Sequence, residues 1–251
     1  MRMRFWPFRS TKMTEQQPAY VLHSRPWRET SVIVDLFTLN QGRVSVIVHG
    51  ARKSQGKQPA KRALIQPFTP LMVSFTGRGE LRTCVQFDAA GPPLAVLGDY
   101  LYSGLYVNEL LLKLLAVDDP HPNLFAYYQA LLNGLIDNPV LEQCLRPFEV
   151  HLMDELGYHM VLDKDYTTSK QVVSEGLYEL HPLQGVCLIQ ESPNELGHRP
   201  SISGKVLLQL ADGHYADTQC LKVAKYMARA NLNQILGGKP LQSRNLFHAV
   251  V

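Results

Sequence analysis

The chain has only four cysteines, and none is placed as a metal or disulfide framework would place it. Cys84, Cys144, Cys187 and Cys220 are widely spaced, with no CxxC pair and no tight cluster of cysteine and histidine. Zinc sites and disulfide-rich domains both show closely spaced, patterned cysteines. We therefore expect no metal, no cofactor and no disulfide framework.

Long hydrophobic runs are also missing. The longest strongly apolar run, residues 110–117, is interrupted by Lys113, whereas a membrane-spanning helix needs about 20 apolar residues. Residues 1–12 are basic and lack the apolar core of a signal peptide. We interpret residues 1–13 as a disordered basic arm or as an extension from an upstream start. The expected location is the cytoplasm, without membrane contact.

The usual signatures of an enzyme are absent: there is no GxSxG elbow and no complete phosphate-binding loop. Two polar groups could still serve metal-dependent chemistry, and they contain His151, Asp154, Glu155, Asp163 and Asp165. A solvent-facing helix surface and a turn are the simpler explanations of these groups. We therefore expect a protein that is not an enzyme, and an Mg²⁺-dependent enzyme is the alternative.

Acidic residues are scarce in the first third of the chain. Residues 1–90 hold 14 lysines and arginines against 5 acidic residues, a net charge of +9, while residues 91–251 hold 11 against 17, a net charge of −6. The basic stretch, residues 43–62, contains no carboxylate. Its six cations are Arg43, Arg52, Lys53, Lys57, Lys61 and Arg62. Charges without local partners must face water or a polyanion, and nucleic acid is the obvious polyanion.

Alternating apolar residues predict five short strands in the same part of the chain. They cover residues 19–24, 32–38, 43–49, 71–76 and 81–87. The one long connection follows the third strand and contains the basic stretch. This layout is typical of a five-stranded OB-fold barrel, which holds single-stranded nucleic acid on its strands and loops; an SH3-like barrel is the nearest alternative.

The apolar period becomes helical after residue 93. Helices are predicted over residues 94–116, 123–136, 139–156, 203–211 and 217–236, with Asn123 and Asp217 as N-caps. Pro147 lies inside the third of them and should kink it or make it restart. The interpretation is an α+β multidomain protein: a barrel (14–90), a helical domain in two parts (91–162 and 201–251) and a small extended insert (163–200).

Two groups of residues have the character of binding sites. Arg25, Trp27 and Arg28 place an aromatic ring between two guanidinium groups, which suits a base stacked on the ring and phosphates held by the cations. Lys222, Lys225 and Arg229 are spaced by three and four residues, and therefore form one basic face of the last helix. That face could hold nucleic acid or an acidic peptide.

Longer motifs resemble the RecO family of DNA repair proteins, notably its gamma-proteobacterial branch. In the barrel they are residues 23–31 (HSRPWRETS), 42–44 (GRV), 50–52 (GAR), 66–70 (QPFTP) and 77–81 (GRGEL). In the helical region they are residues 101–110 (LYSGLYVNEL), 145–146 with 148–149, 156–158 (LGY), 236–241 (LGGKPL) and 243–244. The resemblance covers nearly the whole chain from Met13 onward.

The resemblance implies a non-catalytic recombination mediator. Such a protein binds single- and double-stranded DNA, anneals complementary strands and, with RecR, helps to load RecA onto DNA coated by single-stranded-DNA-binding protein. It also implies that the acidic, Phe-ended tail of the coating protein docks on the helical domain, where Arg146 occupies the matching motif position. We assign DNA contact to the barrel cations with Trp27, and expect a bacterial, nucleoid-associated protein.

Two departures from the family pattern stand out. Some relatives hold zinc through four cysteines in the insert, but here that region contains only Cys187, and no metal is expected. Pro147 stands where a second basic residue is more usual after Arg146.

Two alternatives stay open beside the mediator: a nuclease or other DNA-processing enzyme built on Asp163 and Asp165 or on the His151 group, and an adaptor that binds only proteins.

Overall fold

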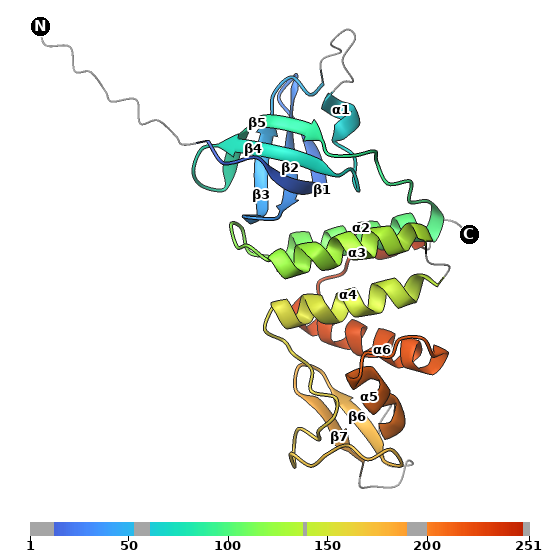
Figure 1. Cartoon of the computed structure of the whole chain (residues 1–251). Coiled ribbons are helices and arrows are strands. Elements are labelled where there is room, and N and C mark those ends of the chain that lie inside the picture. The colour runs from blue at the N-terminus through green and yellow to red at the C-terminus, as the bar shows by residue number, and fades with distance from the viewer. Residues whose placement is uncertain (1–12, 53–60, 138–139, 190–199, 248–251) are drawn as a thin grey trace, which may run out of the picture. The chain divides into compact units, whose positions relative to one another are not determined.

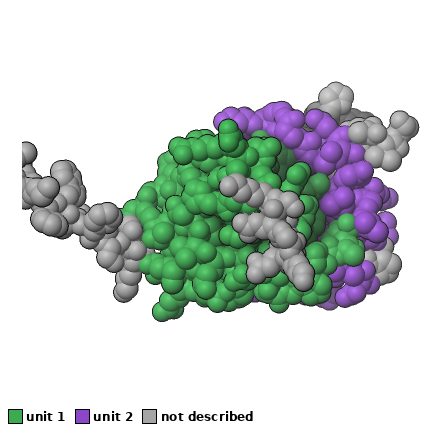
Figure 2. Space-filling view, turned by 90° about the horizontal axis from the view of Figure 1, so that it is seen from above, with its two compact units in different colours: residues 1–96, 104–125 green, residues 97–103, 126–251 purple. Residues whose placement is uncertain are grey.

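The computed structural model describes residues 13–52, 61–137, 140–189 and 200–247 (Figure 1). The chain divides into two compact units, one formed by residues 1–96 and 104–125 and the other by residues 97–103 and 126–251 (Figure 2). We describe each unit by itself. Among the helices in these described ranges, none has the length and apolar character needed to cross a bilayer.

Five strands close a barrel in the first unit, in the order β1-β2-β3-β5-β4. They are β1 (Gln17–Trp27), β2 (Ser31–Thr38), β3 (Gly42–Val48), β4 (Leu71–Thr76) and β5 (Leu81–Ala89). Neighbours are antiparallel except for β3 and β5, which are parallel. The five strands confirm the prediction of an OB-fold barrel followed by helices.

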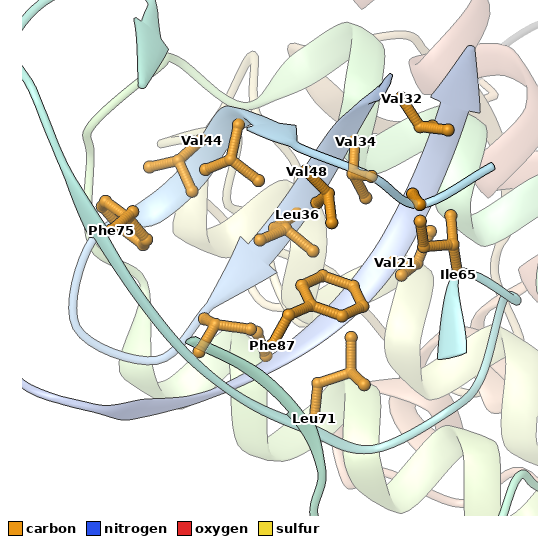
Figure 3. Close-up of a cluster of buried hydrophobic side chains, with 14 residues drawn as sticks. Val21, Val32, Val34, Leu36, Val44, Val48, Ile65, Leu71, Phe75 and Phe87 are labelled. Carbon is orange, nitrogen blue, oxygen red and sulfur yellow. The ribbon is translucent and has the colours of Figure 1, made fainter. Parts of the chain in front are cut away.

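The barrel core follows from the alternation in the sequence. In β3, Val44, Val46 and Val48 are buried, whereas the residues between them are half-buried. Buried apolar side chains from all five strands fill the interior (Figure 3). Ile65, which directly follows the short helix α1 (Lys61–Leu64), joins them. The sequence did not predict α1.

The β2–β3 turn requires glycine at position 42. Gly42 has a φ of +62°, which lies in the left-handed region, and a Cβ there would come within 1.7 Å of the carbonyl oxygen of Asp119. Side chains other than hydrogen are excluded on both grounds. The turn is therefore held against the segment that follows the helix ending at Leu114, within the same unit.

The long helices are α2 (Gly98–Leu114), α3 (Pro122–Asp137), α4 (Leu141–Glu155), α5 (Gly204–Ala211) and α6 (Thr218–Ile235), followed by the 3₁₀ helix η1 (Gln242–Phe247). The second half of α2 packs on the barrel, where the buried Asn108 amide donates to the carbonyl oxygens of Val21 and Leu22 at 3.2 and 3.3 Å. The first compact unit therefore contains the barrel and the second half of α2.

Two helix predictions need correction. α2 begins at Gly98, not at residue 94, because Gly98 has a φ of +57° and the Leu94 N–H bonds to the carbonyl of Phe68. α3 begins at Pro122, one residue before the predicted Asn123 cap, since proline is favoured in a first turn. α4 runs through Pro147 without restarting, and the kink expected there stays a prediction. The Asp217 cap of α6 is confirmed, because its side chain accepts from the Gln219 N–H.

A small sheet in the second unit joins two strands of the insert to a short strand that follows it, with the order β7-β6-β8. Its strands are β6 (Leu177–His181), β7 (Gly185–Leu188) and β8 (Ile202–Ser203). The buried faces of β6 and β7 pack with α5 and α6 around Tyr178, Leu180 and Val186. Figure 1 shows the β6–β7 hairpin beside α5.

Candidate nucleic-acid interface

The β1–β2 turn brings an aromatic ring and two guanidinium groups together at one end of the barrel. Trp27 ends β1 and is 38% exposed, and the Arg28 guanidinium carbon lies 5.8 Å from the centroid of its ring. Arg52, which follows β3, donates its backbone N–H to the Thr30 carbonyl at 3.0 Å and a side-chain N–H to the Arg28 carbonyl at 3.4 Å. Three residues predicted to contact DNA therefore form one cluster.

Four cations of the first unit are open to solvent in the described structure. Arg28, Arg52, Lys61 and Arg62 are all exposed, and within the described ranges no ion pair joins any of them to a carboxylate. Glu29 is exposed in the same turn. Lys61 and Arg62 belong to α1, whose position is fixed by Leu64 and Ile65 on the barrel core. The predicted contacts Lys53 and Lys57 lie outside the described residues.

Arg25 is different, because its charge is largely compensated. One of its guanidinium nitrogens lies 2.9 Å from the Asp35 carboxylate, although 51% of the Arg25 side chain is exposed. Asp35 is buried in β2 and also accepts from the Ser45 hydroxyl at 2.5 Å. An ion pair of this kind positions Arg25 but leaves it a weaker attraction for phosphate.

Arg43 is not brought into the cluster. It lies at the start of β3, opposite Phe37, whereas Arg52 follows the far end of that strand. Its Nε donates to the Leu115 carbonyl at 3.0 Å, and its own carbonyl accepts from the Asp118 N–H. These contacts give Arg43 a structural role in joining the barrel to the end of α2.

The basic face predicted in the last helix lines a groove in the second unit. The groove has a volume of about 480 Å³, and its lining residues are Lys222, Lys225, Tyr226, Arg229, Ala230, Asn233 and Arg244. All three predicted cations therefore share one surface. Sequence reasoning missed Tyr226 and Asn233, although the spacing of 222, 226, 229 and 233 places them on the same helix face.

One of these cations has a partner from a neighbouring helix. The Lys225 ammonium lies 2.5 Å from the Glu142 carboxylate of α4, and so its charge is shared. Lys222 and Arg229 are exposed, and no ion pair is found for either within the described ranges. The attraction that the groove exerts on an anion therefore comes mainly from Lys222 and Arg229, with Arg244 beside them.

Arg146 does not line this groove. Its side chain is only 6% exposed and lies 2.5 Å from Glu149, which is 1% exposed. Its Nε is buried without a hydrogen-bond acceptor in the described structure. A guanidinium that is buried with its own carboxylate cannot reach a peptide without breaking that pair, so contact between Arg146 and a partner tail stays a prediction.

The residues considered for an enzyme are only partly brought together. His151, Asp154 and Asp163 line one cavity of about 770 Å³ with His159 and Tyr215, but they do not approach closely enough to hold one ion together. His151 stacks on Tyr127 with ring centroids 3.6 Å apart, and burial lowers the pKa of its imidazole.

Asp165 is fully engaged in holding the insert together. Its carboxylate accepts from the backbone N–H groups of Thr167, Thr168 and Leu188 and from the Thr167 hydroxyl, at 2.6–2.9 Å. Burial alone would raise the pKa of Asp165, but these hydrogen bonds outweigh it and hold the pKa below its usual range. A carboxylate with this many backbone partners has little capacity left for a catalytic metal.

A different set of residues has metal-binding character. The ligand atoms of Glu179, His181 and Cys187 all lie within 4.8 Å of one another, and no other described group of three such side chains is this close. The sequence did not indicate this set, because its members belong to three residue types and two strands.

Comparison with known proteins assigns both parts of the chain. The sequence profile described as Recombination protein O N terminal matches residues 13–92, and that described as Recombination protein O C terminal matches residues 98–229. The barrel and its cation cluster thus fall within the first match, and α2 to most of α6 fall within the second.

Curated relatives are similar over almost the whole chain. A protein of Marinobacter nauticus is 42% identical over 236 residues, which are 93% of this chain and 94% of the relative. One from Pseudoalteromonas atlantica is 40% identical over 233 residues, with 93% and 94% coverage, and one from Coxiella burnetii is 39% identical over 236 residues, with 94% and 99% coverage. Each of the three is named DNA repair protein RecO. The chain therefore belongs to the RecO family of DNA repair proteins.

Proposed function

We propose that this protein is a non-enzymatic recombination mediator of bacterial DNA repair. It binds single- and double-stranded DNA, anneals complementary strands and, with RecR, helps to load RecA onto DNA coated by single-stranded-DNA-binding protein, acting in the cytoplasm at the nucleoid. The observation that carries the proposal is the cluster of Trp27, Arg28 and Arg52, with Lys61 and Arg62 on α1. The four cations are exposed and have no carboxylate partner within the described ranges, and Arg28 lies over the exposed Trp27 ring.

Binding and annealing follow from the same electrostatics. Cations that contact phosphates release the counterions condensed on DNA, which supplies affinity independent of sequence. A surface that neutralises phosphates on two strands at once lowers the repulsion between them, so that complementary bases can pair. Trp27 adds a stacking platform, since a base on an aromatic ring contributes about 1–3 kcal/mol regardless of its identity.

The groove on α6 is the proposed site for the tail of the coating protein. An acidic peptide ending in an aromatic residue needs cations for its carboxylates and an apolar surface for its ring. Lys222, Arg229 and Arg244 meet the first need, and Tyr226 with Ala230 meets the second. Arg146 is kept as a candidate contact only if its pair with Glu149 opens.

Strand annealing is the test of the mediator proposal. Complementary oligonucleotides are mixed with wild-type protein, with and without the coating protein, and with a variant in which Arg52, Lys53, Lys61 and Arg62 are changed to alanine. A matched control changes four exposed cations of the second unit, Lys164, Lys170, Lys205 and Lys239. We expect annealing to be lost in the barrel variant and retained in the control. Equal annealing by both variants would contradict the proposal.

A further inference from the structure

The β6–β7 hairpin presents three metal-binding side chains on one face. Glu179 of β6 lies directly opposite Cys187 of β7, and His181 is two residues further along β6, opposite Gly185. Residues two apart in a strand point to the same face, and directly opposite residues of an antiparallel pair have neighbouring side chains. The pairing register therefore gathers the carboxylate, the imidazole and the thiol.

The backbone that carries these side chains is well fixed. Tyr178 and Leu180, which alternate with the two β6 ligands, are buried in the core of the second unit. Leu188, next to Cys187, donates its N–H to the Asp165 carboxylate at 2.7 Å. The three candidate ligands thus extend from strands held on their other side.

The cluster is also sheltered from solvent. The side chains of His181 and Glu179 are 25% and 19% exposed, and the Tyr166 ring lies 5.2 Å from the His181 ring. Gly185 leaves the position opposite His181 without a side chain, and a Cβ there would meet the Cβ of Tyr166 at 3.1 Å. Tyr166 therefore packs against the hairpin beside the cluster, close to both Gly185 and His181.

We propose that Glu179, His181 and Cys187 form a zinc-binding site. The His181 Nε2 atom lies 2.6 Å from the Glu179 Oε1 atom, and the Cys187 Sγ atom lies 4.0 Å from the same oxygen. Tetrahedral zinc with bonds of about 2.0–2.3 Å needs its ligand atoms roughly 3.3–3.8 Å apart. Small side-chain rotations are enough to reach this geometry, with a fourth position for water or another ligand.

The donor set selects zinc over the common hard cations. Magnesium and calcium take oxygen ligands almost exclusively, whereas a thiolate with an imidazole suits zinc. Binding releases the Cys187 thiol proton, and any proton held between His181 and Glu179, to solvent. The affinity for zinc therefore falls as the pH is lowered.

Zinc here has a structural use. β8 contains only two residues, and a sheet of three short strands contributes little stability of its own. A metal that joins β6 to β7 adds its binding free energy to the folding of the insert. The expectation of no metal came from the scattered cysteines and the lack of a tight cluster of cysteine and histidine, and a mixed site assembled across two strands does not show that pattern.

The proposal is tested by metal binding to the full chain without an affinity tag. The chain is treated with chelator, dialysed and titrated with Co²⁺ as a spectroscopic substitute for zinc, and zinc retained after reloading is measured by atomic absorption. We expect one metal per chain and a thiolate-to-cobalt charge-transfer band. Cys187→Ser removes the band, and His181→Gln weakens binding by about tenfold or more.

Two matched controls make the assignment specific. Cys144→Ser and His214→Gln change the same residue types in the same unit, outside the cluster, and leave both readouts unchanged.

Burial raises the pKa of the Cys84 thiol to about 12 and also raises that of Cys220, so neither competes readily as a thiolate. Absence of stoichiometric metal in wild type, or a band that survives Cys187→Ser, overturns the proposal, and circular dichroism of each variant checks that it is folded.

Discussion

The barrel and the helical unit both contain arginines that the sequence singles out, but they use them in opposite ways. Arg28 and Arg52 of the barrel are exposed without a carboxylate partner in the described structure, whereas Arg146 of the helical unit is buried against Glu149. Residues 1–90 carry a net charge of +9 and residues 91–251 a net charge of −6. A surplus of cations leaves some of them open to phosphate, and a surplus of acids supplies internal partners.

The same contrast operates inside the barrel. Arg25 pairs with Asp35, and Arg82 lies 2.6 Å from Asp118 while its guanidinium packs 5.2 Å from the Phe75 ring centroid. Both stabilise the fold instead of presenting open charge. The availability of a nearby carboxylate, more than the position of a cation in a basic stretch, therefore separates the cations that are open to solvent from those that hold the fold together.

The largest effect on stability is expected from Arg146→Ala. The substitution leaves the Glu149 carboxylate buried without its cation, which costs about 3–5 kcal/mol for a buried pair. Arg229→Ala, on the exposed face of α6, is expected to stay within about 0.5 kcal/mol of wild type. Urea denaturation measures both. Replacing Arg146 and Glu149 together by apolar residues should recover most of the loss. Equal stability of the two single variants would contradict a structural role for Arg146.

The salt dependence of DNA binding is expected to change next most strongly. If five or six barrel cations contact single-stranded phosphates, log affinity falls against log salt with a slope of about −3.5 to −4, and each cation removed makes the slope shallower by about 0.7. The variant of Arg52, Lys53, Lys61 and Arg62 should therefore show a slope near −1 and bind roughly 10²- to 10³-fold more weakly at 0.1 M salt. Fluorescence anisotropy with a labelled oligonucleotide measures both quantities, and a wild-type slope near zero would remove the electrostatic mechanism.

The barrel was predictable from the sequence because its signals are local. Alternation in segments such as Val44, Val46 and Val48 specifies strands and their inner face, and the basic stretch after β3 marks the long connection. The groove was predictable in part, since helical spacing alone aligns Lys222, Lys225 and Arg229. Periodicity within one helix or strand thus predicts which of its residues share a face.

The rest depends on contacts between residues distant in sequence. Nothing near Arg43 indicates that the carbonyl of Leu115 accepts from it. The spacing of Arg146 and Glu149 is compatible with an ion pair on α4. It does not predict that both side chains are buried. The Glu179, His181 and Cys187 cluster likewise arises from the strand register, which single-sequence patterns do not specify.

A comparison of two buried carboxylates sharpens the contrast further. Asp35 in the barrel is held by a cation, whereas Asp165 in the insert is held mainly by backbone N–H groups. In Asp165→Asn the amide nitrogen faces the Leu188 N–H, which leaves two donors opposed and costs about 1–3 kcal/mol. Thermal or urea unfolding near neutral pH measures the loss.

The pH dependence of this effect has a definite sign. Because the pKa of Asp165 is lowered in the folded state, its stabilisation is fully present above the unfolded value of about 3.9 and is lost as the pH falls below it. The gap between wild type and Asp165→Asn should therefore narrow in acid. A gap that widens below about pH 4 would show that the carboxylate is not held in its charged form.

The smallest effect concerns the groove, where two cations of one helix face can be compared directly. Arg229→Ala removes an exposed charge and should weaken binding of an acidic, Phe-ended peptide by about tenfold, since a hydrogen bond to a charged group contributes about 1.5–3 kcal/mol. Lys225→Ala should weaken it less, because the Glu142 carboxylate already shares that charge. Calorimetry with the peptide gives the order, and binding of a bare oligonucleotide should stay unchanged in both variants. If Lys225 proves the more important of the two, the presence of a carboxylate partner does not decide which cations of this protein bind ligands.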